Sequence, residues 1–496
     1  MLSSMLLIAV LQGATGCADS AALEGGQALD EATASGQTLL VVGTDPAAMT
    51  TDIYLVRALG VGAASAPSIA EANTFGVEAI TRSNSATEGL LDPTTERLFS
   101  EQLPFAIPDR SGNRLALVIS SITQEDEPPL ARPALLTLSP RTQLEGPAVP
   151  GLFGARFTWL GEYIVLQIAD PETGQHRLQV VASDSIDDIT SWSDLGPESP
   201  SLDVRFQGLL AESNTVLALA TDPDTGLSGA YLLDPDTGLQ TALTEQVEAN
   251  VIDAVVSSDG QLLAITTQQL QPETRDITLI DVASGTAHSI TDTLNSDCYW
   301  PAFAPAQPPP SATQLAFVCQ DPDSERPDIV LWSEELAQLD LATESPATPE
   351  ILTAAPQPAV FDGTMDELVL RSPPQWDPDG QRIVFGASTQ AEAYSGDGMT
   401  LFALPFDGTA YPIYSGNDTS VGWAHFSSNS DADQLLVWER SETGLDDTNN
   451  TPGDYHQPIR VVSTETSMPQ VGYVQLGVNL RIGYPLFLGH NSLFYP

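Results

Sequence analysis

Two of the three cysteines have a spacing that predicts a disulfide. Cys298 starts one predicted strand and Cys319 ends the next. In an antiparallel hairpin, paired residues have a constant sum of residue numbers, and Cys298 and Cys319 give the same sum as Phe303 and Gln314, which flank the intervening loop. The two cysteines should therefore face each other and form a disulfide, with two free buried thiols as the alternative. A catalytic cysteine is not favoured, because no histidine lies near Cys319 in the sequence.

Two short stretches, 222–226 and 234–238, repeat the pattern Asp-Pro-Asp-Thr-Gly. Oxygen-rich turns of this kind can hold calcium, which takes six to eight oxygen ligands. Neither stretch has the full calcium-binding loop with its terminal glutamate, and the same residues are good turn formers. Plain turns are the favoured interpretation, and calcium is left as a weaker one whose candidate ligands are Asp222, Asp224, Asp234 and Asp236.

The remaining residues predict no catalytic site. The five histidines are scattered, without the spacing of a metal-binding pair. No nucleophile elbow, phosphate-binding loop or dinucleotide fingerprint is present. We therefore predict no catalytic residue and no cofactor, apart from the calcium candidates.

These residues are carried on a unit of four short strands that recurs along the chain. The fullest copies lie at 254–291, 299–332 and 373–385. A four-stranded unit repeated about every 50 residues is the signature of a β-propeller. Eight copies are predicted, with seven as the alternative because those between 150 and 240 are weak. The second strands of the eight copies contain Leu40, Leu115, Ile164, Val216, Leu262, Leu315, Ile383 and Leu435.

The C-terminal stretch, 482–495, resembles the start of another copy, whereas the first copy lacks a clear leading strand. We therefore expect the C-terminal strand to complete the N-terminal blade, which removes the free edges of the ring.

The copy at 373–385 has the clearest pattern. Asp379-Gly380 predicts a hairpin turn, because glycine adopts a positive φ at little cost. Residues 383–385, Ile-Val-Phe, are typical of a strand buried on both faces. The stretch 376–385, Trp-Asp-Pro-Asp-Gly-Gln-Arg-Ile-Val-Phe, resembles the repeat of TolB-type propellers. This resemblance implies an all-β, TolB-like propeller over 38–496.

The predicted loops between second and third strands are long, whereas most first-to-second connections are tight turns. Because strands alternate in direction, all the long loops emerge on one face of a propeller. This long-loop face is predicted to bind a partner, with tolerated insertions as the alternative. The loops are 121–133, 267–275, 320–327, 387–398 and 440–458.

The chain has 66 acidic and 17 basic residues, all of the latter arginine, and a formal net charge of −49. Such a surface repels nucleic acid and anionic lipid headgroups, which excludes both as partners. At molar salt the Debye length falls to about 3 Å, and self-repulsion largely disappears. We therefore predict a saline habitat. A GC-rich genome is the alternative for the missing lysines, but it does not explain the excess of acids.

Residues 1–16 form a short apolar stretch that ends in small residues, as in a signal peptide. Residues 14–17 resemble a bacterial lipoprotein box, which implies lipidation of Cys17, and in that family Ala18 implies the outer membrane. A plain secretory signal is the alternative. Residues 17–37 are predicted to be an acidic flexible tether. Export to an oxidising compartment agrees with the predicted disulfide.

These features predict a non-catalytic outer-membrane lipoprotein that faces the periplasm or the exterior. Its propeller would bind another envelope protein or a cell-wall polymer through the long-loop face. We expect a monomer that touches the membrane only through its lipid anchor. The alternative is a propeller enzyme of polysaccharide lyase or glycosidase type. Such an enzyme needs carboxylates or histidines at the axis, whereas the predicted first strands, such as 254–256, are mostly apolar.

Overall fold

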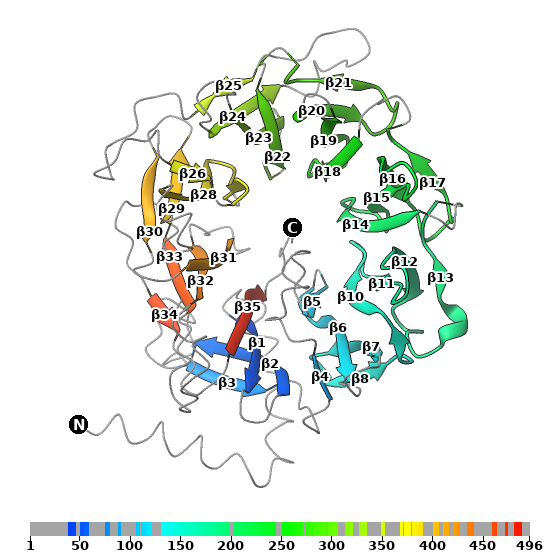
Figure 1. The fold of residues 1–496 in the computed structure, drawn as a ribbon. Helices are drawn as coiled ribbons and strands as arrows, with labels where there is room; N and C mark the ends of the chain where they lie inside the picture. Colours follow the sequence, from blue (N-terminus) through cyan, green and yellow to red (C-terminus); the bar gives the residue numbers. More distant parts are fainter. Residues whose placement is uncertain are drawn as a thin grey trace, which may run out of the picture.

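The chain folds into small antiparallel β-sheets that stand around a common centre (Figure 1). Short strands rich in Val, Ile and Leu alternate with turns that carry glycine. The computed structural model describes residues 38–45, 50–58, 75–79, 88–90, 106–109, 111–121, 130–197, 202–244, 250–270, 273–292, 294, 296–305, 313–320, 327–334, 349–352, 368–370, 372–377, 379–389, 400–405, 410–415, 420–426, 434–440, 459–463, 472–474 and 481–488.

The first two sheets are formed by the N-terminal part of the chain, and the last described strand of the chain adds to the first of them. The first has the order β3-β2-β1-β35, with β1 Thr38–Asp45, β2 Thr50–Ala58, β3 Phe75–Ala79 and β35 Arg481–Leu488. The second contains β4 Glu88–Leu90, β5 Ala106–Pro108, β6 Arg114–Ser121, β7 Leu130–Thr137, β8 Thr142–Glu145 and β9 Val149–Pro150.

The next three sheets each have four strands in sequence order. The third has β10 Leu152–Phe157, β11 Tyr163–Ala169, β12 His176–Ala182 and β13 Ser193–Asp194, with a short 3-10 helix, η1 Ile189–Ser191, before its last strand. The fourth has β14 Asp203–Leu209, β15 Val216–Thr221, β16 Ser228–Leu233 and β17 Gln240–Ala242. The fifth has β18 Asn250–Val256, β19 Leu262–Leu270, β20 Glu273–Asp281 and β21 Ala287–Ser289.

Three further sheets lie between the fifth and the first. The sixth has β22 Asp297–Phe303, β23 Thr313–Gln320, β24 Pro327–Glu334 and β25 Glu350–Ile351. The seventh has β26 Leu368–Leu370, β27 Gln375–Trp376, β28 Arg382–Thr389, β29 Thr400–Pro405 and β30 Tyr411–Ser415. The eighth has β31 Ser420–Phe426, β32 Gln434–Arg440, β33 Ile459–Ser463 and β34 Gly472–Val474.

This radial arrangement of antiparallel sheets confirms the predicted all-β propeller. Figure 1 shows that the first strands of the third to sixth sheets lie nearest the common centre. We call these strands, β10, β14, β18 and β22, the inner strands. The strand β35 pairs antiparallel with β1, with Thr38 opposite Leu488 and Thr44 opposite Arg481. The described strands fall into eight sheets. The blade count and the closure of the complete ring stay predictions.

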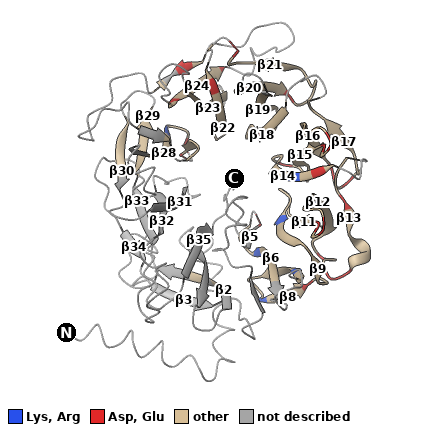
Figure 2. Ribbon diagram, viewed as in Figure 1, with Lys and Arg blue, Asp and Glu red and all other residues tan. Residues whose placement is uncertain are grey.

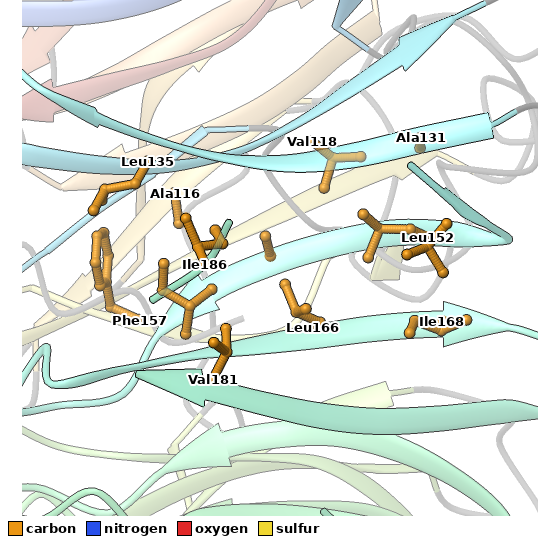
Figure 3. Close-up of a cluster of buried hydrophobic side chains, with 13 residues drawn as sticks. Ala116, Val118, Ala131, Leu135, Leu152, Phe157, Leu166, Ile168, Val181 and Ile186 are labelled. Carbon is orange, nitrogen blue, oxygen red and sulfur yellow. The ribbon is translucent and has the colours of Figure 1, made fainter. Parts of the chain in front are cut away.

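The third to sixth sheets each pack their two faces against two different neighbours. In the third sheet, Leu166 and Ile168 of β11 pack against Ala116 and Val118 of the second sheet (Figure 3). Val165, between them in the sequence, belongs to a separate cluster that reaches into the fourth sheet. Alternate residues of a strand point to opposite faces, so both faces of β11 are buried. This explains why second strands are predominantly apolar.

The same holds for the stretch from which the TolB-type resemblance was drawn. Ile383 and Phe385 pack in a cluster that includes residues of the sixth sheet, and Val384 is also buried. Gly380 has a φ of 65°, and its N–H donates to the carbonyl of Asp377 at 3.0 Å. The predicted strand and turn are confirmed. The buried Asp377 carboxylate holds the turn, since its Oδ1 accepts from the backbone N–H groups of Gln381 and Arg382.

The predicted cysteine pair forms a disulfide. Cys298 of β22 lies opposite Cys319 of β23, with a Cα–Cα distance of 4.1 Å, and both residues are buried. The predicted register is wrong at the other end of the hairpin, because Phe303 pairs with Leu315 instead of Gln314. A β-bulge between Tyr299 and Ala302 adds residues to one strand.

We expect the variant carrying both Cys298→Ala and Cys319→Ala to fold with lower stability. The bond closes a loop over a sequence separation of 21 residues, and for a loop of this length the chain-entropy model gives about 3 kcal/mol. Denaturant unfolding of the wild type and the variant, each with and without reductant, measures the difference. Reductant should lower the stability of the wild type and leave the variant unchanged. Equal stabilities of the two oxidised proteins would contradict the prediction.

Candidate functional site

Several predicted functional segments lie outside the described residues. These are the signal peptide and tether, with the lipidation candidate Cys17, and most of the long-loop face. The predicted loop at 267–275 is wrong, because residues 267–270 of β19 pair with residues 273–276 of β20. In the described part of the chain, no helix is long and apolar enough to cross a membrane. Among those same residues, no three side chains of His, Cys, Asp or Glu gather as a metal-binding group.

The calcium candidates lie in two turns at opposite ends of β16, so the two stretches cannot form one site. In the first, Asp222 Oδ1 accepts from the backbone N–H of Asp224 at 2.9 Å. In the second, Asp234 Oδ1 accepts from the N–H of Asp236 at 2.9 Å. A turn with the same chain-reversing hydrogen bond, from Gly174 N–H to the carbonyl of Asp170, joins β11 to β12. The repetition supports the plain-turn interpretation.

Asp236 has a further role in a polar network between the third and fourth sheets. The buried Asn214 donates through Nδ2 to Asp236 at 3.1 Å and to Glu162 at 2.7 Å. Asn214 Oδ1 accepts from the hydroxyl of Thr158 at 2.8 Å. A hydrogen bond to Asp236 raises the pKa of Tyr163. These contacts link the first-to-second turns of two neighbouring sheets.

Three inner strands begin with a residue that sequence reasoning missed. Asp203, Asn250 and Asp297 start β14, β18 and β22 at equal intervals in the sequence. The side-chain oxygen of each accepts a backbone N–H from the third strand of the preceding sheet. The donors are the N–H groups of His176, Ser228 and Arg275, respectively. We call these contacts the inter-sheet clasps. Their even spacing is the sequence signal that could have revealed them.

The carboxylates of two clasps, Asp203 and Asp297, also form ion pairs with arginines. His176 Nδ1 lies 2.9 Å from Asp203 Oδ1, and Arg205 Nε lies 2.9 Å from Asp203 Oδ2. Burial alone would raise the pKa of Asp203, but the hydrogen bonds from His176 and the charge of Arg205 outweigh it and lower the pKa to about 2. Arg275 pairs with Asp297 and lies 3.9 Å from the ring centroid of Tyr299.

The inner strands present more polar and aromatic groups than the sequence predicted. Trp300 has a φ of 58°, in the left-handed region that non-glycine residues rarely adopt. Trp300 lies at the bulge in β22, and its ring meets the ring of Tyr299 edge-on, with the two ring centroids 4.9 Å apart. Figure 2 shows acidic and basic residues side by side on β14, at the inner side of the ring. The expectation of mostly apolar first strands was drawn from stretches such as 254–256, and it does not extend to β14, which carries Asp203 and Arg205.

Arg156 of β10 is a buried arginine without an acidic partner among the described residues. Only 6% of it is exposed, and its guanidinium carbon lies 3.8 Å from the ring centroid of Phe206 on β14. Its Nε is buried without a hydrogen-bond partner. Burial lowers the pKa of Arg156 to about 9, so the side chain is charged at neutral pH. A desolvated cation–π contact contributes about 2 kcal/mol, which is less than the several kcal/mol that burial of a charge costs.

Gln167 of β11 lies beside Arg156 on the same face of the third sheet. Gly154 is opposite Gln167, and Arg156 is opposite Val165, so the two polar side chains share a face. Gln167 is 4% exposed, and its Nε2 has no hydrogen-bond partner. A Cβ atom at Gly154 would lie 2.8 Å from this Nε2, so glycine makes room for the amide. Two unsatisfied donor groups thus face the fourth sheet together.

Comparison with known proteins supports the fold and does not assign a function. No protein-family model and no curated protein matches the chain. Among solved structures, it is similar to TolB from Acinetobacter baumannii, with 14% identity and a TM-score of 0.35 over 75% of this chain and 83% of TolB. It is also similar to the β-propeller domain of the Trilobed protease from Pyrococcus furiosus, with 9% identity and a TM-score of 0.39 over 76% and 91%.

A third solved structure, dihydro-heme d1 dehydrogenase NirN, is 12% identical with a TM-score of 0.50 over 92% of this chain and 76% of that one. At these identities the likeness shows the fold alone. The fold is that of a propeller, and TolB, whose repeat the sequence resembles, is among the similar structures.

We expect Asp203→Asn to weaken the dependence of stability on acidic pH. The pKa of Asp203 in the fold, about 2, lies below its ordinary value near 4. The ionised carboxylate therefore stabilises the fold above about pH 4, and this contribution is lost as the pH falls towards 2. Denaturant unfolding between pH 5 and 2, at constant ionic strength, should show a smaller loss for the variant than for the wild type. The exposed Asp187, changed to Asn, is the control and should behave as wild type; equal pH dependence in all three proteins would contradict the prediction.

We expect Asp234→Ala to destabilise the fold equally with calcium and with a chelator. The substitution removes the acceptor for the N–H of Asp236 and for the hydroxyl of Thr237, and each lost hydrogen bond costs about 1 kcal/mol. Denaturant unfolding in calcium chloride and in EDTA measures the effect. Asp224→Ala is the control, because it leaves the backbone hydrogen bond of its turn intact. A loss seen only in calcium would contradict the plain-turn interpretation.

Proposed function

We propose that the protein is a non-catalytic propeller scaffold of the cell envelope, anchored to the outer membrane through Cys17. It binds another envelope protein or a cell-wall polymer through its long-loop face. The disulfide between Cys298 and Cys319 supports a place outside the reducing cytoplasm. The charge of −49 supports a saline environment in which exposed acids are screened.

The proposal of a non-catalytic role rests on the contacts that the carboxylates of the inner strands make. An enzyme acting at the axis would need its acid and base on the inner strands, and Asp203 and Asp297 are carboxylates that begin β14 and β22. Both instead join neighbouring sheets through backbone N–H groups and cations. With a pKa of about 2, Asp203 stays ionised at neutral pH and cannot serve as a general acid. These groups therefore support the architecture of the binding scaffold.

One residue favours the alternative, a polysaccharide lyase or glycosidase. Asp253 of β18 accepts a hydrogen bond from the N–H of Ala254 at 2.9 Å, and burial raises its pKa to about 6. A carboxyl group with such a pKa suits a general acid. Its shift arises from burial and not from a neighbouring carboxylate, whereas glycosidases place two carboxyl groups about 5 to 10 Å apart. The binding role is therefore preferred.

Affinity isolation tests the proposal. The tagged protein is purified from detergent-solubilised membranes at molar salt, and co-eluting proteins and glycans are identified by mass spectrometry. We expect one stoichiometric partner, lost when the 440–458 loop is shortened. A variant with the same loop composition in scrambled order separates loss of sequence from loss of length and charge.

Two outcomes would overturn the proposal. A partner retained after the loops of this face are shortened would place binding elsewhere. Cleavage of an envelope polysaccharide by the purified protein, abolished by Asp253→Asn, would establish the enzyme instead.

A further inference from the structure

We propose that the propeller binds a carboxylate group between its third and fourth sheets, at a site formed by Arg156, Gln167 and Phe206. This site is separate from the long-loop face. Arg156 lies two residues before Thr158, whose N–H closes the first-to-second turn by donating to the carbonyl of Tyr163. The long loops are predicted to join second to third strands of other sheets; in the third sheet that connection is the tight turn closed from Gly174 to Asp170, and it lies at the other end of the sheet. The ligand at this site and a partner on the long-loop face would therefore occupy different ends of the propeller.

Arg156 differs from the other arginines whose contacts are described. In a chain with 66 acidic residues, an arginine readily finds a carboxylate. Arg156 does not, although it is more than nine-tenths buried and carries an unpaired Nε. The arginines with a carboxylate partner are Arg114 with Asp109, Arg132 with Glu145, Arg205 with Asp203, Arg275 with Asp297 and Arg382 with Asp377.

A second unpaired donor lies on the same face of the third sheet. The Nε2 of Gln167 is buried and unpaired, on the face that Arg156 shares. The amide lies over Gly154, where a Cβ atom would come within 2.8 Å of Nε2, so glycine allows the amide to take this position. One charged and one neutral donor with no acceptor define a place for an anion, because buried donors are almost always hydrogen-bonded.

The chemistry of the site favours a carboxylate over other anions. A planar guanidinium binds a planar carboxylate through two parallel hydrogen bonds. Phe206 covers one face of the Arg156 guanidinium, so a ligand approaches at its edge, in the plane where the N–H groups point. A single unpaired positive charge matches a single negative charge, whereas phosphate dianions are repelled by a chain of charge −49. Uronic acids of polysaccharides and the C-termini of peptides both carry this group.

Ligand-induced stabilisation of the full-length protein tests the site, since a ligand that binds only the folded state raises its melting temperature. The probes are sodium glucuronate, N-acetylalanine and sodium phosphate, each exchanged for chloride at constant ionic strength. Methyl glucuronate, the uncharged ester, is the control for the sugar ring. We expect one of the two carboxylates to raise the melting temperature of the wild type with the logarithm of its concentration. The more effective one identifies a sugar acid or a peptide terminus as the source.

Three variants connect the effect to the site. Arg156→Met keeps the apolar stem and removes the charge, and it should fold at least as stably as the wild type without a probe. It should weaken carboxylate binding at least tenfold, and Gln167→Ala should weaken it severalfold. Arg177→Met removes an exposed arginine and should bind as wild type.

Three results would overturn the proposal: equal stabilisation of wild type and Arg156→Met, equal effects of the ester and the acid, or phosphate binding as tight as either carboxylate. None of these results would affect the partner isolation on the long-loop face.

Discussion

Burial of a sheet between two neighbours, as in the third to sixth sheets, is the constraint on which the rest of the described structure depends. A four-stranded sheet exposes two apolar faces, and it is stable here only because the preceding sheet covers one and the following sheet covers the other. Leu166 and Val165 are adjacent in β11, yet they belong to different apolar clusters. This double burial favours apolar residues at successive positions of the second strand, and the buried Gln167 of β11 departs from this pattern.

Apolar packing alone does not fix how far one sheet slides along the next, because the faces are chemically uniform. The inter-sheet clasps fix this relative position. Asp203, Asn250 and Asp297 each bond a backbone N–H at the start of a third strand in the preceding sheet. A shift by one residue would leave a partly buried donor and acceptor unpaired, which costs about 1–3 kcal/mol for each group. The clasps therefore set the relative height of neighbouring sheets.

The sequence predicted the features that depend on local chemistry. Apolar strands, the glycine turn at Asp379-Gly380 and the pairing of Cys298 with Cys319 follow from residues close together in the chain. It did not predict the bulges, which add residues to inner strands and change which side chains face the centre. The error at Phe303 arose in this way, because a constant sum of residue numbers assumes a hairpin without insertions.

The candidate sites were harder to predict because they join residues from different sheets. Arg156 and Phe206 meet only when the third and fourth sheets are placed side by side, and nothing in either strand alone distinguishes this arginine from one in a salt bridge. The clasp residues are spaced at equal intervals in the sequence, but this spacing can be recognised only once the starts of the inner strands are known. Residues that act locally were therefore predicted, whereas residues that act between sheets needed the fold.

The placement of the arginines also explains how such an acidic chain can hold together in salt. Exposed charges separated by more than the Debye length are screened, whereas partly buried pairs are screened much less. At molar salt the repulsion among surface acids largely disappears, while the pairs of Arg275 with Asp297 and of Arg114 with Asp109 persist because their carboxylates are partly or fully buried. Arginines held between sheets and within turns thus keep their effect in a medium that screens surface acids. The unpaired Arg156 keeps its charge in that same medium, so its attraction for an anion is also preserved.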